Sequence, residues 1–312
     1  MAGVYLGRHM TSGQVVAVKV ARDRGCEGDY LERTRDQFAR EAEILSLLRP
    51  CRHIVSLLAS GQFCARRPYL VMEHVDGWDL EREIVNHGPF SPTEVANLLT
   101  QVCAGLQAAH DLGIAHLDLK PQNIMLRRGQ SRRVVLVDFG IARRRGDSRK
   151  VAGWVEGSPL YMAPEQLAGD DEHLGPAADI HALGLLAYLL LSGRLPFDLD
   201  QRWCIGDLIR SRLGRDPVAL ANRTPWLPSD LCLLVDSCLA VDPIARPHSA
   251  AVFSHAFRHT AADSCDRSAQ KTLLNLRVAL AMTLPLATAS KKRRTLVKGL
   301  EPRPPSRTQH HS

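Results

Sequence analysis

Residues 114 to 125 read I-A-H-L-D-L-K-P-Q-N-I-M and place three polar side chains, Asp118, Lys120 and Asn123, between apolar flanks. A loop that carries a carboxylate, an amine and an amide so close together is hard to explain as core. A second carboxylate, Asp138, ends the apolar run in V-V-L-V-D-F-G-I-A, which is typical of a strand. Two carboxylates and an amide at loop positions can hold a divalent cation, because such ions prefer oxygen ligands.

The composition is that of an ordinary soluble globular protein, with 45% hydrophobic and 23% charged residues in a chain of 312. This length allows one large domain or two lobes with ample core. The eight cysteines are scattered without a C-x-x-C pair, which argues against a zinc site or a disulfide framework and favours a reducing compartment. The N-terminus has no apolar run after a basic one, so we expect no signal peptide and a cytoplasmic protein.

The excess positive charge is concentrated at the C-terminal end. From Thr260 onward there are ten Lys or Arg against three Asp or Glu, whereas residues 1–259 carry 30 of each. The net charge of +7 therefore belongs to a tail, 260–312, and we expect no nucleic-acid binding from it. An apolar segment at 273–289 is short for a membrane span and contains Arg277. A docking helix with a basic, disordered end is preferred, and contact with a membrane surface is expected only through this tail.

The motif H-x-D-x-K-x-x-N followed by D-F-G resembles the catalytic and metal-binding loops of the eukaryotic-like protein kinase family. The sequence M-A-P-E-Q-L resembles the corresponding segment of bacterial Ser/Thr kinases. The resemblance implies that Asp118 orients the acceptor hydroxyl and takes its proton, and that Lys120 neutralises charge on the transferred phosphoryl group. It also implies that Asn123 and Asp138 hold Mg²⁺ (or Mn²⁺) and that His116 supports the loop.

Residues 1–20 predict two strands joined by a T-S-G-Q turn. Kinases place a G-x-G-x-x-G-x-V loop over the ATP phosphates at this point. Val4 fits the final Val of that loop and would pack on the adenine, while Ala2 stands where the third Gly is expected. The first two glycines and the preceding strand have no counterpart. We therefore expect either a chain that is N-terminally truncated within the Gly-rich loop or one that works with an incomplete lid.

The sequence V-A-V-K resembles the third strand of the kinase N-lobe. This implies that Lys19 holds the α- and β-phosphates of ATP and that Ala17 belongs to the ATP site. The spacing of apolar residues predicts a helix over 34–48, and its R-E-A-E-I-L sequence resembles the family's C-helix. That places Glu41 opposite Lys19, with Glu43 as the competing choice; the alternative is a solvated charged face without such a role.

Two further strands are predicted at 54–58 and 69–75. The second ends in M-E-H-V, which resembles the hinge between kinase lobes. The resemblance implies contacts with ATP from four residues, namely Met72 at the back of the adenine pocket, backbone groups of Glu73 and Val75 at the adenine edge, and Asp79 near the ribose. Met72 can also be plain core, and both interpretations can hold together.

Two helices are predicted after the hinge-like segment. Ser91, with Glu94 three residues later, is a capping box that begins a helix running to His110, which we expect to be a surface or packing residue. Residues 177–192 are apolar on most faces, which predicts a buried central helix rather than a membrane span, because the run is too short to cross a bilayer.

The sequence G-S-P-L-Y-M-A-P-E resembles the substrate-docking end of the kinase activation segment, with Ser158 where Thr is usual. The resemblance also implies three structural residues. Asp179 would bind the backbone of the catalytic loop, and Arg246 in D-P-I-A-R-P would pair with Glu165.

One residue departs from the family pattern. Where the family often has H-R-D, this chain has H-L-D, so Leu117 replaces an Arg that usually pairs with a phosphate on the activation segment. Between Gly140 and Gly157 the one hydroxyl is Ser148, so we expect activity that does not depend on phosphorylation there. The basic run at 143–150 is either a solvated loop or a feature that favours acidic substrates.

These observations together predict an α+β, bilobal protein-kinase fold. The catalytic domain would span 1–259, with a β-rich N-lobe at 1–74 and a helical C-lobe at 75–259, followed by the tail. The expected function is an ATP-dependent protein serine/threonine kinase. A pseudokinase or scaffold is the alternative, and a small-molecule phosphotransferase is a weaker one, because such an enzyme should lack A-P-E and D-P-x-x-R-P.

Overall fold

The computed structural model describes residues 2–22, 29–63, 67–129, 132–147, 157–170, 172–197 and 205–262. Ser148 and the tail beyond residue 262 lie outside the described residues, so the structure does not bear on the predictions for them.

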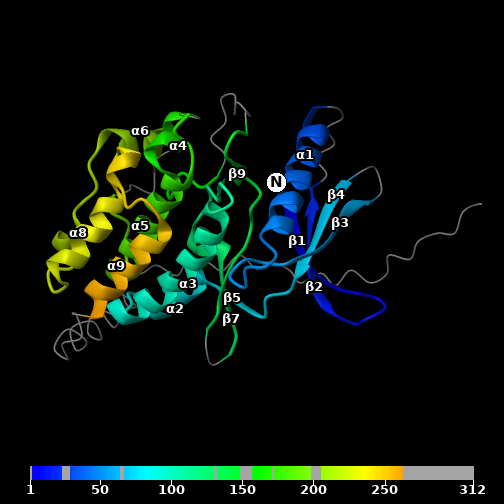
Figure 1. Ribbon diagram of the computed structural model, residues 1–312, viewed down its shortest axis with the longest axis horizontal. Coiled ribbons are helices and arrows are strands. Elements are labelled where there is room, and N and C mark those ends of the chain that lie inside the picture. Colours follow the sequence, from blue (N-terminus) through cyan, green and yellow to red (C-terminus); the bar gives the residue numbers. More distant parts are fainter. Residues whose placement is uncertain are drawn as a thin grey trace, which may run out of the picture.

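The N-terminal part is a four-stranded antiparallel sheet with one helix (Figure 1). The order is β1-β2-β4-β3, with β1 at one edge. The elements are β1 (Ala2–Arg8), β2 (Val15–Ala21), α1 (Asp29–Leu47), β3 (Leu57–Phe63) and β4 (Arg67–Glu73). The predicted hairpin and helix are confirmed, and the helix begins earlier than its apolar spacing indicated.

The strand predicted at 54–58 exists, but its bounds were placed too early. Strand β3 starts only at Leu57 and continues to Phe63. The apolar residues before it serve another contact, because Ile54 forms a parallel bridge with Leu136 and Val55 donates its amide to the Leu136 carbonyl at 3.0 Å. Ile54 and Val55 are buried, so this run is apolar because it joins the two parts of the molecule.

Strand register brings four predicted nucleotide-site residues onto one face of the sheet. Val4 of β1 lies opposite Lys19 of β2, and Ala17 of β2 lies opposite Met72 of β4. Residues directly opposite each other share a face, and so do residues two apart on one strand. Val4, Ala17, Lys19 and Met72 therefore point to the same side, which is the side that α1 reaches through Glu41.

Short strands lie between the sheet and the helices (Figure 1). They are β5 (Gly77–Asp79), β6 (Ile114–Ala115), β7 (Ile124–Arg127), β8 (Val134–Leu136) and β9 (Arg143–Arg144). β5, β7 and β8 form one antiparallel sheet, and β6 pairs with β9. Strand β5 runs so close to β7 that a Cβ at Gly77 would lie 1.9 Å from the Leu126 carbonyl oxygen. Only glycine fits there.

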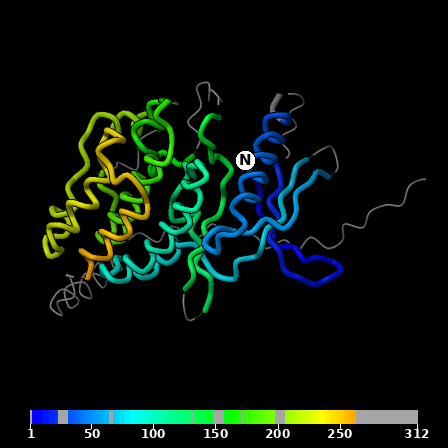
Figure 2. The backbone as a smooth tube through the Cα atoms, viewed as in Figure 1, coloured from blue at the N-terminus to red at the C-terminus, as the bar shows by residue number. Residues whose placement is uncertain are grey.

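The C-terminal part is helical, as the tube in Figure 2 also shows. Its helices are α2 (Leu80–His87), α3 (Pro92–His110), α4 (Pro164–Ala168), α5 (Pro176–Ser192), α6 (Ile205–Gly214), α7 (Leu220–Arg223), α8 (Ser229–Cys238) and α9 (Ala250–Ala262), with single 3-10 turns at Pro121–Asn123 and Pro243–Ala245. The Ser91 capping box is present at the start of α3.

Helix α5 is the centre of the helical part. Most of its residues are buried, and it packs against α3 and α8, as predicted for 177–192. Helix α9 packs along α3 and continues three residues past His259, with Ala261 buried in the core. In the described residues no helix is both long and apolar enough to cross a membrane.

Candidate active site

Lys19 is the centre of a three-residue ionic cluster between the sheet, α1 and the segment after β8. Its Nζ donates to both carboxylate oxygens of Glu41, at 2.6 and 2.7 Å, and to Asp138 Oδ1 at 2.6 Å. Glu41 is 1% exposed, whereas Glu43 lies at the surface. The choice of Glu41 over Glu43 therefore agrees with the structure.

The cluster shifts the pKa values of its members in opposite directions. Burial alone would lower the pKa of Lys19, but the charges of Glu41 and Asp138 outweigh it and raise that pKa above its ordinary value. Burial would raise the pKa of Asp138, but Lys19 lowers it below the usual range. Lys19 is thus a fixed cation and Asp138 a fixed anion at neutral pH.

The backbone around Asp138 is constrained. Asp138 has a φ of 67°, a left-handed conformation that costs free energy for a residue other than glycine and is common at functional sites. A Cβ at Gly140 would lie within 3.1–3.3 Å of Asp138 Oδ1, Lys19 Nζ and Glu41 Oε2, so a side chain there would press on the ionic cluster. Gln37, one helical turn before Glu41, donates to the Gly140 carbonyl at 2.9 Å.

The catalytic-loop residues form a second connected group. Lys120 Nζ donates to Asp118 Oδ2 at 2.6 Å and to Ser158 Oγ at 2.7 Å. Asn123 Nδ2 donates to the same Asp118 oxygen at 2.9 Å and to the Asp118 carbonyl at 2.8 Å. The Ser158 amide donates to Asp118 Oδ1 at 3.1 Å. The structure therefore brings together Asp118, Lys120, Asn123 and Ser158, although Ser158 is far away in the sequence.

Asp179 of α5 holds the backbone that carries this group. Its carboxylate accepts the amides of His116 and Leu117, both at 2.8 Å. Leu117 has a φ of 65°, and the bond to Asp179 offsets the strain of that conformation. Burial would raise the pKa of Asp179, but His110 and His116 keep it lowered. The residue is an anion that is fully buried.

His116 has the supporting position expected for it. It is fully buried, its Nδ1 accepts the Asp118 amide at 3.2 Å, and its ring lies 4.5 Å from the Phe139 ring. The side chain thus connects the catalytic loop to the segment that carries Asp138.

The predicted hinge residues lie at the end of β4 and just after it. Met72 and Val75 are buried at 7% exposure each. The Glu73 amide donates to the Ser56 carbonyl at 2.9 Å, and the Glu73 side chain pairs with Arg127 of β7. Asp79 is the N-cap of α2 and accepts the Arg82 amide at 2.8 Å, so it has a structural role whether or not it contacts a ribose. Val4 is 65% exposed on β1.

Arg246 and Glu165 pair as expected from D-P-I-A-R-P and A-P-E. The guanidinium donates to both Glu165 oxygens at 2.7 Å, and both side chains are buried. This pair joins the start of α4 to the segment after α8 and stabilises the helical part.

The positions of Asn123 and Asp138 fit a hard divalent cation. Ile124 pairs with Leu136 in the β7–β8 ladder, and the Val137 amide donates to the Asn123 carbonyl at 2.9 Å, so Asn123 and Asp138 leave the ladder at the same end. The Asn123 amide nitrogen is occupied by Asp118, which leaves its oxygen as a ligand. In the part of the chain that the structure describes, no group of three or more His, Cys, Asp or Glu side chains could hold a metal. An amide and carboxylate oxygens are the donors that Mg²⁺ prefers.

Several residues of the site lie outside the motifs that are recognisable in the sequence. His110 was expected at the surface or in packing, yet its Nε2 lies within hydrogen-bond distance of Asp179 Oδ2, at 2.8 Å. Gln166 donates to the Leu117 carbonyl at 2.9 Å. Arg212, which contacts the Leu160 carbonyl, and His181, which contacts Arg212, were also missed. Only Gln37 had a readable signal, because it lies four residues before Glu41 on a predicted helix.

Comparison with known proteins agrees with these features. The protein kinase domain family matches residues 1–258. Serine/threonine-protein kinase Pkn1 of Myxococcus xanthus is 38% identical over 277 residues, which cover 87% of this chain and 38% of that protein. Serine/threonine-protein kinase pkn2 of the same species is 37% identical over 266 residues, covering 80% of this chain and 30% of pkn2.

A third relative is the probable serine/threonine-protein kinase PknB of Corynebacterium glutamicum. It is 32% identical over 261 residues, which cover 80% of this chain and 38% of that protein. This chain therefore spans less than half the length of these three relatives. With its H-x-D-x-K-x-x-N and D-F-G motifs arranged as described and the family match extending over residues 1–258, the chain belongs to the protein kinase family.

Proposed function

We propose that this chain is an ATP-dependent protein serine/threonine kinase, which transfers the γ-phosphate of ATP to a Ser or Thr hydroxyl of a protein. The observation that carries the proposal is the network in which Asp118 contacts Lys120, Asn123 and Ser158. Protein kinases in general use ATP and a divalent metal ion, and every charged residue that this chemistry requires is present here.

Asp118 is the acceptor-side residue. Its Oδ2 holds Lys120 and Asn123, and its Oδ1 holds the Ser158 amide; Oδ1 keeps one acceptor position. A substrate hydroxyl that donates there is oriented toward the γ-phosphate. Its oxygen then bonds to the γ-phosphorus, the bond to the β–γ bridging oxygen breaks, ADP leaves with that electron pair, and Asp118 takes the proton.

Lys120 supplies positive charge beside the reacting group. An ammonium has three N–H donors, and Asp118 and Ser158 occupy two of them. The third donor can neutralise charge on the transferred phosphoryl group. Because both contacts fix the ammonium before the reaction, little reorganisation is needed in the transition state.

Lys19 is positioned for the α- and β-phosphates. Glu41 accepts two short hydrogen bonds from its ammonium group, which restricts the side chain to one position in the site. We further propose that Val4, Ala17 and Met72 contact the adenine, that backbone groups of Glu73 and Val75 bind its polar edge, and that Asp79 reaches the ribose. The shared face of the sheet and the hinge position of these residues support this assignment.

Asn123 and Asp138 would hold Mg²⁺ or Mn²⁺. Such an ion supplies charge neutralisation on the phosphates when ATP is bound. The chain itself keeps both ligands in place, because Asn123 is hydrogen-bonded to Asp118 and Asp138 is hydrogen-bonded to Lys19.

We propose protein substrates because G-S-P-L-Y-M-A-P-E resembles the substrate-docking segment of protein kinases. Ser158 of this segment contacts Lys120. The described cysteines Cys51, Cys103, Cys232 and Cys238 are all free thiols, which supports a reducing compartment. We propose that the protein acts in the cytoplasm.

The test is Asp118→Asn. This variant should lose phosphoryl transfer to a generic basic acceptor protein while its affinity for ATP stays within a few-fold of wild type, because Asp118 contacts the acceptor and not the nucleotide. Retention of more than a few per cent of wild-type turnover would exclude the proposed role. A wild-type protein that binds ATP without transferring phosphate would instead be a nucleotide-binding scaffold.

A further inference from the structure

Arg212 is a buried cation that has no anionic partner among the described residues. It lies on α6, is 5% exposed, and in the described part of the chain has no carboxylate within ion-pair distance. Burial lowers its pKa to about 10, so it still carries its charge at neutral pH. Burying a guanidinium that is not paired with a carboxylate is costly. Its N–H groups therefore need other hydrogen-bond acceptors.

The guanidinium binds backbone carbonyls instead. Nη1 donates to the Leu160 carbonyl at 2.6 Å and to the Pro159 carbonyl at 3.2 Å, and Nη2 donates to the Met162 carbonyl at 2.8 Å. The planar guanidinium presents its donors in a fixed fork, so one side chain reaches three carbonyls along one bend of the chain. Arg212 therefore fixes the backbone of residues 159–162.

The segment that Arg212 holds begins next to the reacting groups. Ser158 immediately precedes it, with its amide on Asp118 and its hydroxyl on Lys120. The Tyr161 amide donates back to the Ser158 carbonyl at 2.9 Å, so residues 158–162 form one compact bend. A shift of this bend would move the surface beside Asp118.

His181 orients the guanidinium. Arg212 Nη2 lies 3.2 Å from His181 Nε2, and because a guanidinium only donates, Nε2 must be the acceptor and the imidazole neutral. The Phe197 ring lies 4.3 Å from the guanidinium carbon and covers one face of it. His181 is on α5, two residues after Asp179, so the same helix supports the catalytic loop directly and residues 159–162 through Arg212.

We propose that Arg212 is a positioning residue for the protein substrate. It fixes the bend at 158–162 so that the acceptor segment lies in register with Asp118, while nucleotide binding does not depend on it. This inference rests on the proposed kinase function, because it assigns the bend to acceptor binding. The physical basis is that an error of about 1 Å in the placement of a reactant can reduce turnover by orders of magnitude.

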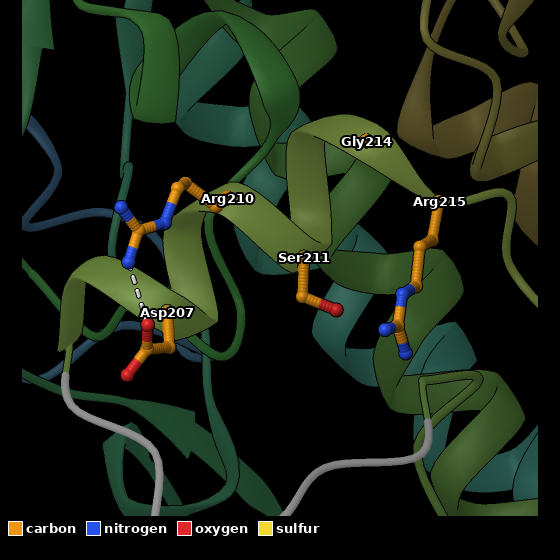
Figure 3. A pocket seen from close by; sticks show the side chains of 5 residues that line it. All are labelled: Asp207, Arg210, Ser211, Gly214 and Arg215. Carbon is orange, nitrogen blue, oxygen red and sulfur yellow. Dashed lines mark hydrogen bonds and ion pairs between the residues drawn. The ribbon is translucent and has the colours of Figure 1, made fainter.

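The experiment compares Arg212→Lys and Arg212→Met with matched controls on the same helix, Arg210→Lys and Arg210→Met. Arg210 is exposed, pairs with Asp207 and lines a hollow of about 350 Å³ with Ser211, Gly214 and Arg215 (Figure 3). Three quantities are measured, namely kcat/KM for myelin basic protein, the Kd of ATP, and hydrogen exchange of individual backbone amides.

Both Arg212 variants should lower kcat/KM for the acceptor protein at least tenfold, and the Kd of ATP should stay within twofold. The Ser158 and Tyr161 amides, which are hydrogen-bonded in the bend, should exchange at least tenfold faster. The His116 and Leu117 amides, which are bonded to Asp179, should be unchanged. The Arg210 controls should match the wild type in all measurements.

Three results would overturn the proposal. They are unchanged exchange at Ser158 and Tyr161, equal loosening at His116 and Leu117, and failure of both Arg212 variants to fold, since each would make Arg212 irrelevant to the bend or a general structural residue. If the wild type itself transfers no phosphate, the proposed function fails, and the exchange of the Ser158 and Tyr161 amides still decides whether Arg212 fixes the bend.

Discussion

Arg246 and Glu165, 81 residues apart in the chain, form a buried two-pronged ion pair with both N–O distances at 2.7 Å. The other guanidinium hydrogens bind carbonyls at Ala177, Ala240 and Val241. One side chain thus joins the start of α4, the start of α5 and the turn after α8. The pair has every polar group satisfied, which is the condition under which a buried ion pair is stable.

Arg246→Ala should lower the free energy of unfolding by roughly 3–5 kcal/mol, because it leaves the Glu165 carboxylate buried without a partner. Urea unfolding measures this directly. As a control, the double variant Glu165→Gln with Arg246→Met should lose less, since it leaves no uncompensated charge. An unchanged unfolding midpoint in Arg246→Ala would mean that the pair contributes nothing.

Glu41→Gln should weaken ATP binding about tenfold, which corresponds to roughly 1.4 kcal/mol. The neutral amide attracts the Lys19 ammonium less strongly than the carboxylate does, so Lys19 is held mainly by Asp138 and is less well placed for the phosphates. Glu43→Gln is the matched control, because Glu43 is exposed on the same helix and should leave affinity unchanged. Equal effects from both variants would contradict the assignment of Glu41.

His181 should make stability depend on pH. Burial, together with the charges of Arg212 and Arg246, lowers its folded-state pKa well below 6.5, so below that value the unfolded chain binds a proton that the folded protein does not. Stability is therefore lost as pH falls. Between about pH 7.5 and about pH 5.5 the loss from this residue should be about 1.4 kcal/mol.

The measurement is urea unfolding of wild type and His181→Gln at both pH values. The variant keeps a neutral acceptor beside Arg212 but cannot titrate. Its stability should change less with pH than that of the wild type by the stated amount. The same pH dependence in both proteins would show that His181 becomes protonated within the fold.

Gly77→Ala should destabilise the protein by about 2–3 kcal/mol or more, because its Cβ would lie 1.9 Å from the Leu126 carbonyl oxygen and the strands would have to separate. Gly214→Ala is the control, since nothing lies within 4 Å of a Cβ there and a small gain in stability is expected. Thermal melting of both variants checks this. Equal midpoints would imply that β5 can move away from β7 without cost.

Local motifs in the sequence predicted much of the candidate site. Asp118, Lys120 and Asn123 are neighbours in the chain, so their spacing alone indicates a shared task. Lys19 and Glu41 could be paired because each lies in a motif with a known partner. These predictions agree with the structure because short loops and regular elements convert sequence spacing into spatial position.

Contacts to the backbone could not be predicted in this way. Arg212 binds three carbonyls, and any sequence at 159–162 supplies the same acceptors, so no pattern marks its partner. The error at β3 has a similar cause, because burial of Ile54 against β8 produces the same apolar run as a strand in the sheet. His110 was underestimated since its role depends on Asp179, which comes 69 residues later.

The left-handed conformation of Leu117 has a consequence for how the protein is made. It is held by Asp179, 62 residues further along the chain, and a ribosome releases the catalytic loop well before that residue emerges. Until α5 has been synthesised and has docked, the Leu117 amide lacks its bond to Asp179, so the strain at Leu117 is not offset by that bond and the loop is not held in this conformation. A nascent chain stopped before residue 179 would contain Lys19, Asp118 and Asp138 but would lack the carboxylate that holds the loop between them.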